Sequence, residues 1–313
     1  MTETARIVDV SAWEEKEEDP DEPLGARGST WLVAPPSEVL GEDLWIYKPV
    51  RARTVIHPDQ TPWFEEDWAE FVATRVGELL HLPVARIELA VRDGHRGVVS
   101  PSFVRDRARP PTFGNELLYR ADPDYPLDAK GEVPGYTPRR CLELLAEHLA
   151  PLGAAPLFTS AVDAFAGYLL LDALVANTDR HHENWAVLQH QGSSYLAPCY
   201  DLGTCLAFQL TDDQRREALE TADVNRTVRA WCERGRSRTF EGRPQLVDAA
   251  VETLHVASET ARDGLVEQLQ ALDDDRLAAV IASVPTDRMS PSAGTFATQV
   301  LQINRARLLE RLS

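Results

Sequence analysis

Three polar side chains in the second half of the chain could carry out chemistry together. Asp179 and Asn184 stand five positions apart, and Asp201 follows them beside a Leu-Gly pair. Phosphoryl transfer uses such a set. One carboxylate orients the acceptor hydroxyl, while an amide five residues on and a second carboxylate hold metal ions against the nucleotide phosphates. Magnesium takes oxygen ligands and keeps part of its water shell, so Asp and Asn suit it. The spacing therefore favours a magnesium-dependent phosphoryl-transfer site.

The segments around these residues support the same interpretation. An apolar run over 162–175 is long enough for a buried helix, and 184–188 and 195–198 predict two short strands around a Gln-Gly-Ser-Ser turn. A helix, a polar loop, a hairpin and Asp-Leu-Gly follow one another in this order around the catalytic centre of a kinase. The alternative is a helix cap followed by a solvated hairpin, in which the carboxylates only satisfy backbone groups.

A glycine-rich stretch lies near the start of the chain. Gly25 and Gly28 precede Ser29, Thr30 and a strand-like run that ends at Val33. Glycine lets the backbone approach a phosphate closely, and successive N–H groups can form an anion-binding concavity. The stretch is therefore a candidate phosphate loop, and a plain turn is the alternative.

A single lysine follows on the next predicted strand, over 44–49. Lys48 is the only lysine between Lys16 and Lys130. A lysine on a strand after a glycine-rich loop is where a kinase places the side chain that grips the nucleotide phosphates. A strand-end lysine that reaches to solvent is the alternative.

The sequence next predicts a helix over 62–82. Pro62 suits its first turn, acids follow at the start, and apolar residues recur at helical spacing. Two strands over 84–91 and 97–104 would form a hairpin around Asp93-Gly94. The double proline within 105–111 then predicts the boundary between two parts of the chain.

Most of the remaining chain predicts helices. Residues 112–135 are expected to be irregular, because Pro, Asp and Gly recur throughout. Six arginines between 226 and 243 form either a patch for an acidic substrate or phosphate, or a solvated helix face. Helices are expected over 137–149, 211–221, 223–235, 244–257, 259–271, 273–283 and 291–312.

Composition limits the partners and the compartment. The 313 residues carry a net charge of −18, which argues against a nucleic-acid backbone or an anionic membrane as the default partner. The four cysteines form no Cys-x-x-Cys pair and are expected to be reduced. No secretory apolar segment opens the chain and no apolar run reaches about 18 residues, so we expect a cytoplasmic protein. The acidic run over 14–23 is expected to be a solvated flexible loop, after one short edge strand within 5–10.

The loop sequence itself resembles a known family. Asn177-Thr-Asp-Arg-His, with Asn184-Trp185 and Tyr200-Asp201, looks like the C-terminal lobe of HipA-like kinases, the serine/threonine kinases of bacterial toxin–antitoxin systems. It is more distantly similar to the Asp-Arg-His-x-x-Asn loop of phosphoinositide kinases. The resemblance is strongest over 160–205. The chain is too short for the extra N-terminal subdomain of HipA, so it resembles the shorter, stand-alone members.

This resemblance implies an α+β, two-lobed protein-kinase-like fold. A partly flexible segment, 1–24, would precede a β-rich, nucleotide-binding N-lobe over 25–108 and a mostly helical C-lobe over 109–313. It implies transfer from ATP, with Mg²⁺, to a serine or threonine of a protein substrate, and an antitoxin or regulatory protein as a further partner. A lipid or small-molecule kinase and a pseudokinase that acts as a binding module are the alternatives.

The resemblance also implies roles for the loop residues. Asp179 would be the catalytic base, and His181 would orient the loop through a hydrogen bond. Asn184 and Asp201 would be the metal ligands.

Further roles in the N-lobe follow from the same resemblance. Lys48 would pair with a helix glutamate, which is Glu70 when counted back from Leu82-Pro-Val84, with Glu66 in reserve. Two groups complete the nucleotide site: the candidate self-phosphorylation sites Ser29 and Thr30, and the adenine-facing backbone of Ser102, Phe103 and Val104.

Overall fold

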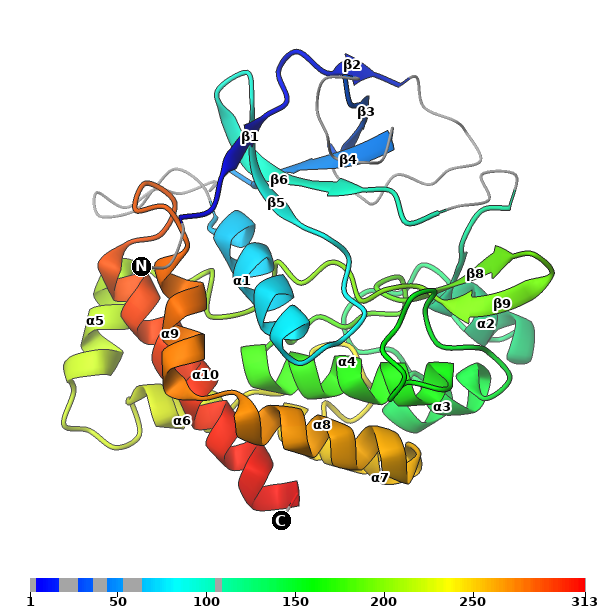
Figure 1. Ribbon diagram of the computed structural model, residues 1–313. Coiled ribbons are helices and arrows are strands. Elements are labelled where there is room, and N and C mark those ends of the chain that lie inside the picture. Colours follow the sequence, from blue (N-terminus) through cyan, green and yellow to red (C-terminus); the bar gives the residue numbers. More distant parts are fainter. Residues whose placement is uncertain (1–3, 17–27, 36–43, 53–63, 105–108, 313) are drawn as a thin grey trace.

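The computed structural model describes residues 4–16, 28–35, 44–52, 64–104 and 109–312. Figure 1 shows a β-rich part and a larger helical part, with helix α1 (Glu66–Leu79) lying between them. This arrangement matches the predicted division into a strand-rich first third and a helical remainder. The predicted boundary at 105–111 falls partly outside the described residues and stays a prediction.

The β-rich part is a mixed sheet with the strand order β1-β5-β6-β4-β3-β2. The edge strand β1 pairs with β5 in parallel, and the other neighbours pair antiparallel. The strands are β1 (Ile7–Asp9), β2 (Glu14–Glu15), β3 (Thr30–Val33), β4 (Leu44–Pro49), β5 (Glu88–Arg92) and β6 (His95–Pro101). β5 and β6 form the predicted hairpin, and Asp93 and Gly94 at its turn have φ of 50° and 78°.

The pleat of β4 decides where Lys48 points. Successive side chains of a strand face opposite sides of the sheet. Trp45 and Tyr47 are buried in a cluster with Val8 and Leu32 on the outer face. Lys48 therefore faces the other way, toward the sheet face on which α1 packs (Figure 1).

Helix α1 is buried along most of its length because it is covered from both sides. Acids in its first turn complement the positive end of the helix dipole. Its apolar residues, among them Phe71 and Val76, join one core cluster with the sheet residues Leu89 and Val98. The same cluster extends into the helical part, so the two parts of the molecule share a core through α1.

The helical part surrounds α4 (Ala161–Val175), the buried helix predicted from the apolar run. Ser160 caps its start and forms a reciprocal capping box with Asp163. Its C-cap, Ala176, has φ 55°, a left-handed turn that ends the helix just before the loop of interest. Helix α4 packs on α3 (Pro138–Leu145), α7 (Leu246–Val256), α8 (Glu259–Ala271) and α10 (Pro291–Leu312), as well as on α1. Helix α10 in turn packs on α5 (Asp212–Glu220), α6 (Val228–Glu233) and α9 (Asp274–Ala282). Within the described ranges no helix has the length and apolar character needed to cross a bilayer.

A second, small sheet follows the loop after α4. β8 (Ala186–His190) and β9 (Ser193–Leu196) form the predicted hairpin, and β7 (Thr112–Phe113) adds a third strand. The prediction that 112–135 is irregular was wrong at its start, because β7 runs directly into α2 (Gly114–Ala121). The side chain of Glu116 returns to the backbone N–H of Phe113 and caps this two-turn helix.

Two other expectations need correction. Glu14 and Glu15 were expected in a flexible loop, but they form β2, which pairs with β3. Backbone pairing at a sheet edge leaves their carboxylates in solvent, so the charge does not prevent the strand. The helix expected over 223–235 begins only at Val228, because Asp223 and Arg226 form a turn before the cap at Thr227.

The close approach of α2 to the loop after α4 gives a test of this packing. A Cβ on Gly114 would overlap the Trp185 ring and lie 2.6 Å from the His182 carbonyl oxygen. Gly114→Ala should therefore lower the free energy of unfolding by about 1–3 kcal/mol or more, through overpacking. Denaturant unfolding measures this. Gly264→Ala in α8 is the matched control, because its nearest neighbour would be 3.7 Å away and alanine favours a helix by about 1 kcal/mol. Equal stability of the two variants would contradict the close contact.

Candidate active site

Lys48 joins three elements that are far apart in the sequence. Its Nζ lies 3.1 Å from Glu70 Oε1 on α1 and 2.9 Å from Asp201 Oδ1, which follows β9. The Lys48 side chain is 27% exposed, that of Glu70 5% and that of Asp201 45%. The structure thus brings together the lysine of β4, the glutamate of α1 and the carboxylate of Asp201. Glu66, the reserve, pairs instead with Arg51.

The charges of this cluster depend on one another. Burial alone would lower the pKa of Lys48, but the negative charges of Asp201 and Glu70 outweigh it and hold that pKa above its ordinary value. The Lys48 ammonium in turn lowers the pKa of Asp201, against the effect of burial. Burial raises the pKa of Glu70, and the Lys48 charge opposes that rise. One cation thus faces two carboxylates.

The backbone of Asp201 is in a special conformation. Its φ is 58°, in the left-handed region that Asp tolerates better than most side chains. Such residues are held by their surroundings and are common at functional sites. Here the Asp201 carboxylate meets Lys48.

Asn177 ties the end of α4 to the loop that follows. Its Nδ2 donates to Asp172 Oδ1 at 2.8 Å. Its Oδ1 accepts from the Asp179 N–H at 3.2 Å and from Thr204 Oγ1 at 2.9 Å. One amide therefore links α4, the loop with Asp179 and the segment after Asp201.

Arg180 is the buried anchor of the same loop. Its side chain is 2% exposed and forks onto Asp172, with contacts of 2.8 and 2.7 Å, while Nη1 donates to the Asn184 carbonyl oxygen at 2.9 Å. Burial would lower its pKa, but the Asp172 charge raises it well above the ordinary value. Tyr136 Oη and Thr239 Oγ1 donate to the Arg180 carbonyl oxygen at 2.9 and 3.0 Å. Arg180 therefore fixes the loop through both its side chain and its backbone carbonyl.

Sequence analysis did not identify Asp172, Asn177, Arg180 or Tyr136 as site residues. A signal for the first was present, because Asp172 is a charge deep inside the mostly apolar run over 162–175, whereas the other acid of that run, Asp163, stands at its start. A buried carboxylate requires a partner, and the nearby loop offers the arginine that follows Asp179.

Asn184 and Asp179 lie against each other across the loop. Asn184 Nδ2 donates to the Asp179 carbonyl oxygen at 2.9 Å, and the Asn184 N–H donates to the His181 carbonyl oxygen at 2.9 Å. The amide nitrogen is thus engaged, and the amide oxygen is the atom of this side chain that can coordinate a cation. Asp179 itself is half-buried.

The two neighbouring histidines differ in their surroundings. His181 Nδ1 accepts from the Glu183 N–H at 3.2 Å, within the loop. His182 is buried, its Nδ1 lies 2.6 Å from Tyr125 Oη, and burial lowers its pKa to about 4. His182 is therefore a neutral core residue at physiological pH.

Oxygen donors are the chemistry that this site offers to a metal ion. Asn184 and Asp201 supply an amide oxygen and a carboxylate, which fit Mg²⁺ with water in its remaining positions. Across the described parts of the chain, no group of three or more His, Cys, Asp and Glu side chains could hold a metal ion. Two oxygen donors of this kind suit magnesium better than a softer metal ion.

The remaining predicted nucleotide residues lie around the same region. Gly25 lies outside the described residues. Gly28 has φ 78°, Ser29 is half-buried, and Thr30 begins β3 opposite Tyr47, one residue from Lys48. The end of the glycine-rich stretch is therefore beside the lysine.

The segment after β6 connects toward the second sheet. The Ser102 N–H donates to the Leu44 carbonyl oxygen at 2.8 Å, and the Val104 N–H donates to Ser102 Oγ at 3.3 Å. Phe103 packs on Tyr200, with ring centroids 5.5 Å apart, next to Asp201. Two of the three N–H groups proposed to face adenine thus already have partners within the protein.

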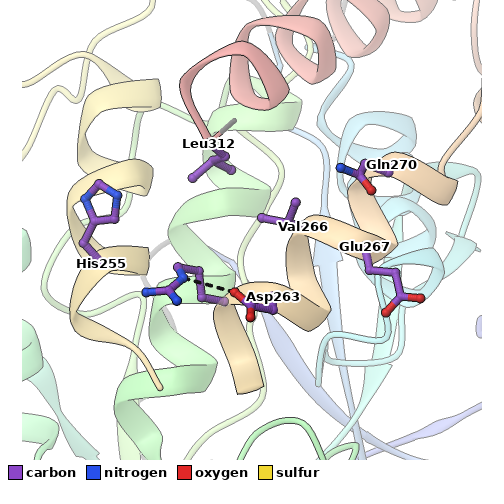
Figure 2. A pocket seen from close by; sticks show the side chains of 7 residues that line it. His255, Asp263, Val266, Glu267, Gln270 and Leu312 are labelled. Carbon is purple, nitrogen blue, oxygen red and sulfur yellow. Dashed lines mark hydrogen bonds and ion pairs between the residues drawn. The ribbon is translucent and has the colours of Figure 1, made fainter. Parts of the chain in front are cut away.

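Two surface depressions lie away from these residues. One, shown in Figure 2, lies between α7, α8 and the end of α10, where an ion pair joins Arg262 and Asp263. None of the residues described above lines it.

The Lys48 cluster predicts an unusual pH dependence for one variant. Lys48→Ala removes the cation and leaves Glu70 and Asp201 close together, which raises the pKa of the pair above the unfolded values. Groups with a raised folded-state pKa stabilise below the unfolded pKa and lose that stability as pH rises through the folded pKa. The melting temperature of Lys48→Ala should therefore fall further below that of the wild type between about pH 5 and pH 8. A pH-independent difference would contradict the coupling.

Comparison with known proteins places the chain in a family. A sequence profile of the HipA-like C-terminal domain matches residues 25–262. No curated protein matches the chain in a sequence comparison. Among solved structures, the proinflammatory kinase CtkA of Helicobacter pylori superposes with a TM-score of 0.73 at 16% identity, over 98% of this chain and 96% of that chain.

A second solved structure shares the fold more loosely. HipA of Shewanella oneidensis MR-1, solved with HipB and its operator DNA, has a TM-score of 0.56 at 13% identity, over 94% of this chain and 68% of that chain. These similarities confirm the predicted α+β, two-lobed, kinase-like fold. Because the profile covers well over half of the sequence, this chain belongs to the family of the HipA-like C-terminal domain.

Proposed function

We propose that this protein is a magnesium-dependent phosphotransferase that uses ATP and phosphorylates serine or threonine on a protein. The observation that carries the proposal is the contact of Lys48 Nζ with both Glu70 and Asp201. In protein kinases the strand lysine must meet the helix glutamate, and the metal-binding aspartate must be in place, before transfer occurs. All three side chains are together here, beside the loop that carries Asp179 and Asn184.

The proposed roles follow from the position and chemistry of each group. Lys48 would exchange its carboxylate contact for the nucleotide phosphates, and Asp201 and Asn184 would hold Mg²⁺, which shields the phosphate charge. Asp179 would orient the acceptor hydroxyl and take its proton. Arg180, anchored on Asp172, would keep the loop in place during transfer.

A pseudokinase role is the competing class of function. No specific observation favours it, because all four side chains are present: Lys48 contacts Asp201, and Asn184 bonds the backbone of Asp179. A regulatory partner protein remains part of the proposal. It is supported by the Shewanella oneidensis HipA structure, which was solved with HipB and operator DNA. The net charge of −18 argues against nucleic-acid binding by this chain alone.

The first test separates nucleotide binding from catalysis. A ligand that binds only the folded state raises the melting temperature, so Mg-ATP should stabilise the wild type. Asp201→Asn removes a metal ligand and should lose both this stabilisation and transfer. Asp179→Asn keeps the ligands, so it should still be stabilised while turnover falls by about 10²–10⁴-fold. Thermal shift and γ-phosphate transfer are measured on the same preparations.

The control for these variants is a carboxylate on the surface. Asp275→Asn, at an exposed position of α9, makes the same change in charge and should behave like the wild type. If Mg-ATP produced no thermal shift in the wild type at any magnesium concentration, the nucleotide assignment would be wrong. Full transfer by Asp179→Asn would instead show that this loop is not catalytic.

The second test concerns the acceptor. An enzyme that acts on an anionic bilayer gains from a basic amphipathic surface, and the strong net negative charge of this chain opposes such binding. Labelled phosphate from ATP should therefore enter the protein fraction of a cell lysate. Phosphoamino-acid analysis should find it on serine or threonine, and Asp179→Asn should reduce it by about 10²–10⁴-fold. Label confined to the organic phase would favour a lipid kinase.

A further inference from the structure

The start of α1 carries two buried acids, and each is paired with an arginine from the helical part. Glu65, directly before the helix, pairs with Arg215 of α5. Asp67, in the first turn, pairs with Arg288 from the segment between α9 and α10. These side chains are almost fully buried, and buried charges persist only when they are paired and hydrogen-bonded.

The Asp67 cluster joins four parts of the molecule. Arg288 Nη1 lies 3.0 Å from Asp67 Oδ2, and its Nη2 donates to the Ala90 carbonyl oxygen of β5 at 3.2 Å. Arg96 of β6 binds both oxygens of Asp67 at 3.0 Å and donates to the Arg288 carbonyl oxygen at 2.9 Å. The segment before α10 is thereby fixed to the sheet and to α1 at once.

The Glu65 cluster adds a second attachment nearby. Arg215 also donates to Asp212 Oδ1 and to the Ala207 carbonyl oxygen, both at 3.1 Å. Ala207 has φ 58° and belongs to the segment that follows Asp201. Ser290 Oγ donates to Asp212 Oδ1 at 2.7 Å, so the two clusters are connected.

Glu70 lies about one helical turn beyond these attachments. A helix moves as a rigid unit over one turn, so a displacement of its start is carried to Glu70. The Lys48 to Glu70 contact is 3.1 Å, and hydrogen bonds weaken steeply once the distance grows by about half an ångström. The position of the α1 start therefore decides whether the Lys48 pair forms.

We propose that Arg215 and Arg288 are positioning residues that hold α1 against the helical part, so that Glu70 meets Lys48. The segment before α10 and the segment after Asp201, both in the C-terminal half of the chain, would then determine whether the Lys48–Glu70 contact forms. The effect on phosphotransfer rests on the proposed function. The placement of α1 does not, since it can be tested without nucleotide.

The composition of the chain offers a direct probe. It contains three lysines, Lys16, Lys48 and Lys130. Brief acetylation with acetic anhydride, followed by peptide mass spectrometry, reports how freely the Lys48 amine reacts relative to the exposed Lys130. Releasing α1 removes Glu70 from Lys48, so Arg288→Met and Arg215→Met should each raise this ratio several-fold. Both should also slow phosphotransfer.

Two comparisons separate positioning from general loosening. Arg307→Met in α10 removes a partly buried arginine that bonds the Cys232 carbonyl oxygen and Asn304 and does not touch α1. It should lower the melting temperature without changing the Lys48 ratio. Arg288→Lys keeps a positive charge beside Asp67 but loses the hydrogen bond to the Ala90 carbonyl oxygen, so the Lys48 acetylation ratio should be intermediate. This variant replaces Arg288→Met if the latter does not fold.

A double variant tests whether the arginine acts through Glu70. Glu70→Gln alone should raise the Lys48 ratio, and adding Arg288→Met should raise it no further, because the contact is already weakened. An unchanged ratio in both arginine variants, or an equal rise in Arg307→Met, would overturn the inference. If the ratios follow the expectation but Mg-ATP has no effect on the wild type, the proposed function fails while the placement of α1 stands.

Discussion

The position of the candidate site depends on the Lys48 ammonium. It lies between a glutamate from a helix and an aspartate that follows a distant hairpin. The buried Glu70 carboxylate is costly to bury alone, and without the cation it and Asp201 repel one another. The sheet, α1 and the Asp-Leu-Gly segment are therefore held in one arrangement because all three are needed to complete this charge cluster. Side chains alternate along β4, so Trp45 and Tyr47 lie on the outer face and Lys48 points inward.

A second ion pair fixes the loop in a comparable way. Arg180 binds Asp172 within the protein and spans the loop to the Asn184 carbonyl oxygen. Such a pair contributes little net stability, because desolvation offsets most of the attraction, but removal of one partner leaves a buried charge. Its value here is geometric. It sets the spacing of Asp179 and Asn184 on a loop whose entry, Ala176, already has left-handed backbone.

Local sequence was enough to predict some of this and not the rest. The Asp179, Asn184 and Asp201 set could be proposed as a site because the catalytic side chains of kinases recur at fixed spacing on one loop and its hairpin. The pair of Lys48 with Glu70 rather than Glu66 required family resemblance, since both glutamates lie on the same helix and periodicity does not separate them. Helix α2 was missed because its two turns are stabilised by a cap and by packing on Trp185, which composition does not reveal. Arg215 and Arg288 could not be assigned either, because their partners stand 150 and 221 positions away.

The distribution of charge would allow so acidic a chain to accept a phosphate under the proposed function. Asp201 and Glu70 alone would repel a nucleotide, yet Lys48 neutralises part of their charge. If the proposed function holds, phosphate alone would compete with both carboxylates for one lysine, and a metal ion alone would compete with that lysine for Asp201. Arrival of both together lets Lys48 pass to phosphate while Asp201 passes to the metal, so neither charge is left unpaired. Under the proposed function, the Lys48 cluster would therefore favour the metal–nucleotide complex over either component.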